Sequence, residues 1–173
     1  MALEIQRVDL KQRELLRNLL NMYLHEMTAF DQIEVGEDGN MEYPHFSCYW
    51  VEPERHPYLI RVKDKIAGFV LVRDIESFRE GSIHTVSEFF VMNMYRQLGI
   101  GEEIARMVFD QFPGQWQVAV QEGNKVARTF WKTVIWRYTG GRMSEFRRSD
   151  WIGPIYEFKS PGAKPPTISP PGE

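Results

Sequence analysis

The chain has 173 residues, of which 43% are hydrophobic and 26% are charged, and its formal net charge is -3 at pH 7. This length is that of one globular domain with its own core, and the weak negative charge argues against a nucleic-acid partner. The single cysteine, Cys48, excludes an intrachain disulfide, and the four histidines show no metal-ligand spacing, so we expect no bound metal.

The first third of the chain is predicted to form a strand, a helix and a long loop. Residues 3–8 alternate as an edge strand does. Asp9 and Gln12 form a capping-box pattern, and apolar residues then recur at helical spacing up to Phe30. Residues 31–57 are acidic at first and aromatic later, which predicts either a solvated loop or one wall of a binding groove that contains a short helix.

The middle of the chain contains the elements around which the rest is organised. Residues 58–62 and 66–75 are predicted strands joined by a hairpin turn, with Gly68 as a possible bulge. Residues 82–94 are apolar and aromatic, as a central strand should be. After a glycine loop, apolar residues at helical spacing predict a helix over 100–112, and Pro113-Gly114 ends it.

The last third repeats the alternation of strand and helix. Residues 116–121 predict a strand, and Asn124 is a plausible N-cap for a helix that ends at Gly140-Gly141. Residues 143–148 and 155–159 predict a final antiparallel pair, and the proline-rich residues 160–173 predict a disordered tail. The fold class is therefore α+β (mixed α/β), with one central, mostly antiparallel sheet.

The glycine loop has the sequence Arg96-Gln97-Leu98-Gly99-Ile100-Gly101. Two positions without side chains let backbone amides close around a ligand where the next helix leaves its first N–H groups unpaired, and such a place attracts phosphate. The loop lacks both the Gly-Lys-Ser/Thr ending and the three-glycine dinucleotide fingerprint. Its pattern, Arg-x-x-Gly-x-Gly, resembles the pyrophosphate loop of the GNAT N-acetyltransferases, and an ordinary strand-to-helix turn is the alternative.

A second motif lies downstream, where Asn124, Ala127 and Trp131 follow a predicted strand. GNAT members have an Asn-x-x-Ala-x-x-x-aromatic helix at this place. The resemblance covers about residues 3–159 and looks closest to the uncharacterised "predicted acetyltransferase" branch, with its Glu-Phe-Phe-Val strand at 88–91. It implies an acetyl-CoA-dependent N-acetyltransferase domain over residues 1–159, whose sheet is splayed between two strands and flanked by helices.

The resemblance also implies which residues hold acetyl-CoA. The strand backbone would pair with the pantetheine arm, the glycine loop would hold the diphosphate, and Asn124 would bind the arm from the facing strand. The implied cofactor-binding residues are Phe90, Val91, Met92, Arg96, Gln97, Leu98, Gly99, Ile100, Gly101, Asn124 and Trp131. Glu102 and Glu103 are expected to point to solvent, since they would repel a diphosphate.

Glu88 is the candidate catalytic residue. An alkyl amine is mostly protonated at neutral pH and must lose a proton before it attacks a thioester. Glu88 is a carboxylate in an otherwise apolar stretch, and family members with a carboxylate there use it as a general base. The alternatives are a carboxylate that only binds a cation or pairs with an arginine, and His84 is the second candidate base.

Trp131 departs from the family pattern. Many members place a tyrosine here, as the acid for the departing sulfur, and an indole cannot release a proton at useful pH. Three outcomes follow: the thiolate leaves unaided, another hydroxyl such as Tyr138 or Tyr95 serves, or turnover is slow or absent.

The predicted function is acetyl transfer from acetyl-CoA to a primary amine, by direct attack in a ternary complex. The acidic stretch from Asp31 to Glu42 favours a small cationic amine as acceptor. The rival interpretation is a non-catalytic acyl-CoA-binding or sensing module. Because the sequence has no apolar run of about 18 residues and no signal-peptide pattern, we expect a cytoplasmic protein without a membrane partner, with a homodimer as one option for its assembly.

Overall fold

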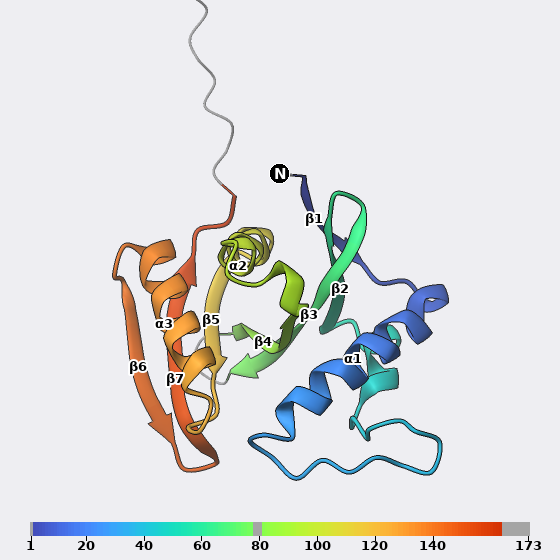
Figure 1. Ribbon diagram of the computed structural model, residues 1–173. Coiled ribbons are helices and arrows are strands. Elements are labelled where there is room, and N and C mark those ends of the chain that lie inside the picture. Colours follow the sequence, from blue (N-terminus) through green and yellow to red (C-terminus); the bar gives the residue numbers. More distant parts are fainter. Residues whose placement is uncertain (1, 78–80, 164–173) are drawn as a thin grey trace, which may run out of the picture.

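The computed structural model describes residues 2–77 and 81–163, and within them the chain forms one seven-stranded sheet with three α-helices (Figure 1). The strand order is β1-β2-β3-β4-β5-β7-β6. Every pair of neighbouring strands is antiparallel except β4 and β5, which are parallel. The expected mixed α/β fold with a mostly antiparallel sheet is thereby confirmed.

The bounds of the elements agree with the predictions in order and differ in length. The strands are β1 Leu3–Arg7, β2 Arg55–Val62, β3 Lys65–Ser77, β4 Gly81–Val91, β5 Gly114–Ala119, β6 Met143–Arg148 and β7 Trp151–Ser160. The helices are α1 Arg13–Met27, α2 Ile100–Gln111 and α3 Lys125–Thr139. The central strand ends at Val91, not at residue 94, because a short 3-10 helix, Asn93–Tyr95, follows it.

The helices cover both faces of the sheet. Helix α1 packs through Leu16 and Leu20 against Phe69 and Leu71 of β3, and all four side chains are buried. Helices α2 and α3 cover the opposite face in a second apolar cluster. Each helix thus buries most of the apolar stripe that its periodicity predicts, but α1 ends at Met27, and Phe30, the last residue of its predicted stripe, is 44% exposed.

The segment between β1 and α1 folds as the sequence indicates. The amide of Gln12 donates to the Asp9 side chain at 3.1 Å, and the Asp9 amide donates to the Gln12 side chain at 3.3 Å, so the capping box is formed. Its first turn is a 3-10 helix, and α1 follows directly. Within residues 31–57 the chain forms a further 3-10 helix, Phe46–Trp50.

Strands β4 and β5 pair only at one end. Their register joins Ile83 to Gln115 and His84 to Trp116, and no further pair follows among the described residues. Beyond the point where it separates from β5, β4 contains a bulge: Leu71 of β3 faces Glu88, and the next pair joins Val72 to Val86. The bulge and the gap between the strands therefore lie beside Glu88.

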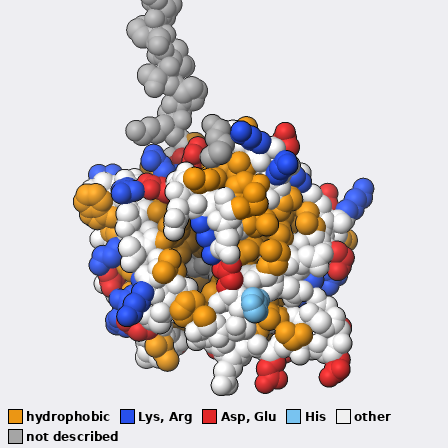
Figure 2. Space-filling view, viewed as in Figure 1, with side chains coloured by type: hydrophobic (Ala, Val, Ile, Leu, Met, Phe, Trp, Pro, Cys, Tyr) orange, Lys and Arg blue, Asp and Glu red, His pale blue; other side chains and the backbone are white. Residues whose placement is uncertain are grey.

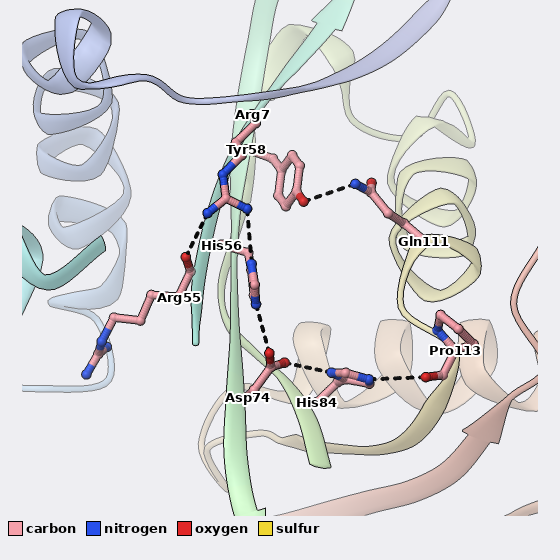
Figure 3. Close-up of polar contacts among 8 residues, drawn as sticks. All are labelled: Arg7, Arg55, His56, Tyr58, Asp74, His84, Gln111 and Pro113. Atoms are coloured by element: carbon pink, nitrogen blue, oxygen red, sulfur yellow. Dashed lines mark hydrogen bonds and ion pairs between the residues drawn. The ribbon is translucent and has the colours of Figure 1, made fainter. Parts of the chain in front are cut away.

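A polar network crosses four elements where the gap begins (Figure 3). Asp74 on β3 contacts His56 of β2 at 2.9 Å and His84 of β4 at 2.6 Å. The second ring nitrogen of His84 lies 3.3 Å from the Pro113 carbonyl, and Arg7 of β1 donates to His56 at 3.1 Å. The carboxylate of Asp74 therefore ties β2 and β4 together at the base of the gap.

The end of the described chain remains attached to the domain. Ser160 belongs to β7, is 1% exposed and donates to the Phe109 carbonyl at 2.6 Å. The amide of Ala163 donates to the Asp110 carbonyl at 3.0 Å. Residues 160–163 of the predicted tail are thus held against α2, and the rest of that tail, residues 164–173, lies outside the described residues.

Candidate active site

A cavity of approximately 370 Å³ lies between β4, β5, α1 and α3. Three of the predicted catalytic and cofactor-binding residues line it: Glu88, Asn124 and Trp131. The structure adds Tyr23 from α1 and Tyr43 from the loop after it. The gap between the splayed strands is therefore lined by the predicted catalytic carboxylate together with two phenols.

Both oxygens of the Glu88 carboxylate accept a hydrogen bond from a tyrosine. Tyr23 donates to Oε2 at 2.5 Å, and Tyr43 donates to Oε1 at 3.0 Å. Burial raises the pKa of Glu88 above its ordinary value, and the two phenol hydrogen bonds act in the opposite direction. Among the described residues, the charge of this buried carboxylate is thus stabilised by two phenol donors and by no arginine or lysine.

The two phenols are held in their protonated form. Burial and the neighbouring Glu88 charge raise the pKa of Tyr23 well above its ordinary value and raise that of Tyr43 as well. Phenols of raised pKa stay neutral at physiological pH and remain donors. Local sequence patterns do not reveal this cluster, because Tyr23 reads as one apolar position of the α1 stripe and Tyr43 as one ring of an irregular loop.

The glycine loop leads into α2 with its amides available. Gln97 and Gly99 have φ values of 61° and 76°, in the left-handed region, and α2 begins at Ile100. Among the described residues, no acceptor is bonded to the amides from Gln97 to Gly101, and the first recorded backbone bond here joins the Glu103 amide to the Gly99 carbonyl. Such a set of free amides at a helix N-terminus suits an anion.

Gly101 lies at a close approach of α2 to α3. A Cβ atom at this position would lie 3.2 Å from the ring of Phe130 on α3, so the start of α2 is in contact with α3. By contrast, a Cβ at Gly99 would meet nothing within 4 Å, and there the positive φ is what favours glycine. The two glycines of the loop thus serve different purposes.

Arg96 does not extend toward the free amides. Its Nε donates to the Val91 carbonyl at 2.5 Å, and its guanidinium contacts both carboxylate oxygens of Glu26 at 2.8 and 3.0 Å. Its guanidinium also lies 5.6 Å from the centre of the Phe90 ring. Arg96 thus takes part in an ion pair that joins the last turn of α1 to the end of β4, and its role in holding the cofactor stays a prediction.

The other predicted cofactor residues differ in which backbone amides and side chains are accessible to a ligand. The Met92 amide donates to the Ala67 carbonyl at 2.8 Å, so it is not available to a ligand, whereas alternation along β4 turns the Val91 amide toward the gap. The side chains of Phe90 and Ile100 are buried, and that of Leu98 is exposed.

The two predicted cofactor residues of α3 and its N-cap, Trp131 and Asn124, both line the cavity. The Asn124 side chain accepts from the Ala127 amide at 3.0 Å, which confirms the N-cap. Trp131 is 7% exposed and packs against Phe89 and Phe130, with ring centroids 5.1 and 5.0 Å apart. Trp131 therefore forms an apolar wall of the cavity, which agrees with an indole that can pack but cannot release a proton.

The remaining candidates for acid or base lie elsewhere. Tyr138 bonds Asp110 and Ser160, each at 2.7 Å, and burial raises its pKa to about 12. His84 belongs to the network around Asp74, and neither His84 nor Tyr138 nor Tyr95 lines the cavity. Of the two acidic residues that open α2, Glu103 is exposed as expected, and Glu102 pairs with Arg137 of α3 at 2.8 Å.

A second, apolar cavity of approximately 610 Å³ lies along α1 and the end of β4. Figure 2 shows hydrophobic side chains gathered on this face, between α1 and α2. Over the described residues, no helix is long and apolar enough to span a membrane. No group of three or more His, Cys, Asp or Glu side chains within residues 2–77 and 81–163 is arranged to hold a metal ion.

The fold resembles solved acetyltransferase structures. An acetyltransferase from Thermus thermophilus is 15% identical, with a TM-score of 0.66 over 92% of this chain and 97% of that chain. PaiA N-acetyltransferase from Thermoplasma acidophilum, in complex with coenzyme A, is 12% identical, with a TM-score of 0.58 over 92% and 99%. Arabidopsis thaliana Naa50, in complex with the bisubstrate analogue CoA-Ac-MVNAL, is 16% identical, with a TM-score of 0.56 over 91% and 97%.

The sequence itself carries the family assignment. No curated protein matches the chain. The family model described as "Acetyltransferase (GNAT) family" matches residues 16–134, which is more than half of the chain and includes most of α1, the glycine loop and much of α3. The chain therefore belongs to the GNAT acetyltransferase family.

Proposed function

We propose that this protein is an acetyl-CoA-dependent N-acetyltransferase of the cytoplasm, which acetylates a primary amine of a small cationic acceptor by direct attack in a ternary complex. The observation that carries this proposal is the buried Glu88 carboxylate, bonded by two phenols and facing the cavity between β4 and β5. A buried base of raised pKa that faces the cavity is suited to remove the proton from an amine.

The chain offers a binding site for the CoA part of the substrate. The free amides from Gln97 to Gly101 suit the diphosphate, and the Val91 amide and Asn124 side chain flank the gap where the pantetheine arm would lie. CoA and a CoA analogue occur in the PaiA and Naa50 structures, which supports this ligand. When bound, acetyl-CoA supplies the activated acetyl thioester.

The charge of the cavity favours a cationic acceptor. Three carboxylates line it, those of Glu88, Asp31 and Glu42, and no lysine, arginine or histidine does so among the described lining residues. The rings of Tyr43 and Trp131 add faces on which an ammonium group is stabilised. Cys48, the one nucleophilic thiol, does not line the cavity, which supports direct attack without an acyl-enzyme.

Two measurements test the proposal. Thermal melts with acetyl-CoA at about a hundred times Kd should show a gain of ~2.7 kcal/mol, or roughly 5–11 °C, which Gly101→Glu should abolish. Release of CoA thiol is then followed with spermidine, a lysine peptide and a neutral aromatic amine. Binding with no turnover on any amine supports the non-catalytic sensing module, and absence of any shift refutes the CoA site.

A further inference from the structure

The departing sulfur takes up a proton when it becomes the free thiol, and Trp131 cannot supply that proton. An indole N–H is a donor only and does not ionise at useful pH. Tyr138 is bonded to Asp110 and Ser160 and, like Tyr95, does not line the cavity. The proton must therefore come from solvent or from another hydroxyl that reaches the reacting atoms.

Two phenols in the cavity meet this need, and they differ in their surroundings. The Tyr23 ring packs edge-on against Phe90, at 6.1 Å between centroids, and Phe90 lies on the side of Glu88 that leads to the glycine loop. Tyr43 lies beside a second buried phenol, that of Tyr49, which is one of the causes of its raised pKa, whereas Tyr49 is not among the causes that raise the pKa of Tyr23. Tyr23 is thus the phenol on the cofactor side of the carboxylate.

The bond between Tyr23 and Glu88 couples two proton transfers in the required order. The Glu88 charge is one of the causes that raise the pKa of Tyr23, so the phenol is a poor acid while Glu88 is ionised. Once Glu88 has taken a proton from the amine, that charge is gone and the phenol becomes more acidic. The acid is therefore strengthened at the stage when the sulfur departs.

We propose that Tyr23 is the general acid of this enzyme and that Glu88 returns the proton to it. The acceptor reacts as the free amine, its ammonium proton having been released to solvent. As its nitrogen bonds to the acetyl carbon, Glu88 takes one proton from nitrogen. As the carbon–sulfur bond breaks, the Tyr23 hydroxyl gives its proton to sulfur and receives the proton held on Glu88. The amide and the free thiol are formed, Glu88 is again ionised, and Tyr23 is again a phenol.

The inference rests on the proposed function, and hydroxylamine tests it without an identified acceptor. Hydroxylamine is uncharged at neutral pH and attacks thioesters without a base, yet the sulfur still has to leave. With enzyme saturated by acetyl-CoA, we expect Tyr23→Phe to slow thiol release by about 100-fold. The matched variant Tyr43→Phe, which removes the other hydrogen bond to the same carboxylate, should slow it less than about tenfold.

Two further measurements, the acetyl-CoA Kd and the rate of a fluorotyrosine variant, distinguish a general acid at Tyr23 from a residue with a purely structural role. The phenylalanine variant keeps the packing of residue 23 on Phe69 and Phe90, so the acetyl-CoA Kd by calorimetry should match the wild type. Tyr23→3-fluorotyrosine, which keeps an ionisable phenol, should restore the rate. Equal rates for wild type and Tyr23→Phe, or equal losses in both tyrosine variants, overturn the inference while leaving the proposed function intact. Failure of the wild type to bind acetyl-CoA overturns both.

Discussion

Replacing Glu88 with glutamine separates the chemistry of the site from its contribution to folding. Glutamine has nearly the same shape but takes no proton at neutral pH. We expect Glu88→Gln to lower kcat for amine acetylation by about 10²–10⁴-fold, the usual contribution of a general base. The Kd for acetyl-CoA should not change, because the amides that suit the diphosphate belong to the separate loop from Gln97 to Gly101.

The same substitution is expected to stabilise the protein. Burial raises the pKa of Glu88 in the folded state, so folding favours the neutral carboxyl group. At neutral pH the unfolded chain holds this group ionised, and folding then costs ~1.4 kcal/mol for each pKa unit of the shift. This cost is absent below the unfolded pKa and reaches its full size above the folded pKa. The neutral glutamine avoids it.

Thermal melts from about pH 4 to pH 8 measure this effect. Each kcal/mol corresponds to roughly 2–4 °C for a domain of this size, so Tm of Glu88→Gln should exceed that of the wild type at neutral pH and converge with it in acid. Glu4→Gln, a change of an exposed carboxylate on β1, is the control and should alter neither Tm nor kcat. A lower Tm at neutral pH, or a wild-type kcat, would refute the reasoning about Glu88.

Three further outcomes are expected. Tyr43→Phe removes a hydrogen bond that lowers the pKa of Glu88, so the acid limb of kcat/KM should move to higher pH; an unmoved limb contradicts this. Arg96→Gln and Glu26→Gln break the same half-exposed ion pair, so each should lower the unfolding free energy by less than ~1 kcal/mol. Both variants should change the acetyl-CoA Kd to the same extent. If Arg96 binds phosphate directly, Arg96→Gln alone weakens binding. Asp74→Asn should lower the unfolding free energy by about 1–3 kcal/mol in denaturant melts, because two histidines lose their shared charged partner.

The structure explains where the predicted element bounds were wrong. Gly153 and Pro154 read as a loop, yet they belong to β7, which begins at Trp151. A Cβ at Gly153 would lie 2.0 Å from the Val120 carbonyl, and the Val120 amide donates to the Pro154 carbonyl at 3.0 Å. The glycine marks a close approach of two strands, and that approach is visible only once the strands are placed together.

Local chemistry was enough to predict the elements of this protein and its glycine loop. The capping box at Asp9, the N-cap at Asn124 and the positive φ at Gly99 each depend on residues close in sequence, so pattern alone indicates them. Together with the two GNAT motifs they determined the fold class, the family and the place of the predicted base.

Tertiary structure alone decided which side chains meet. Tyr23 and Tyr43 lie 65 and 45 residues from Glu88 along the chain, and Glu26 lies 70 residues from Arg96. Such contacts depend on how α1 and the following loop pack on β4, and no local periodicity encodes that packing. The sequence therefore indicated a carboxylate for the chemistry, whereas the packing of distant segments provided the two phenols that bind it.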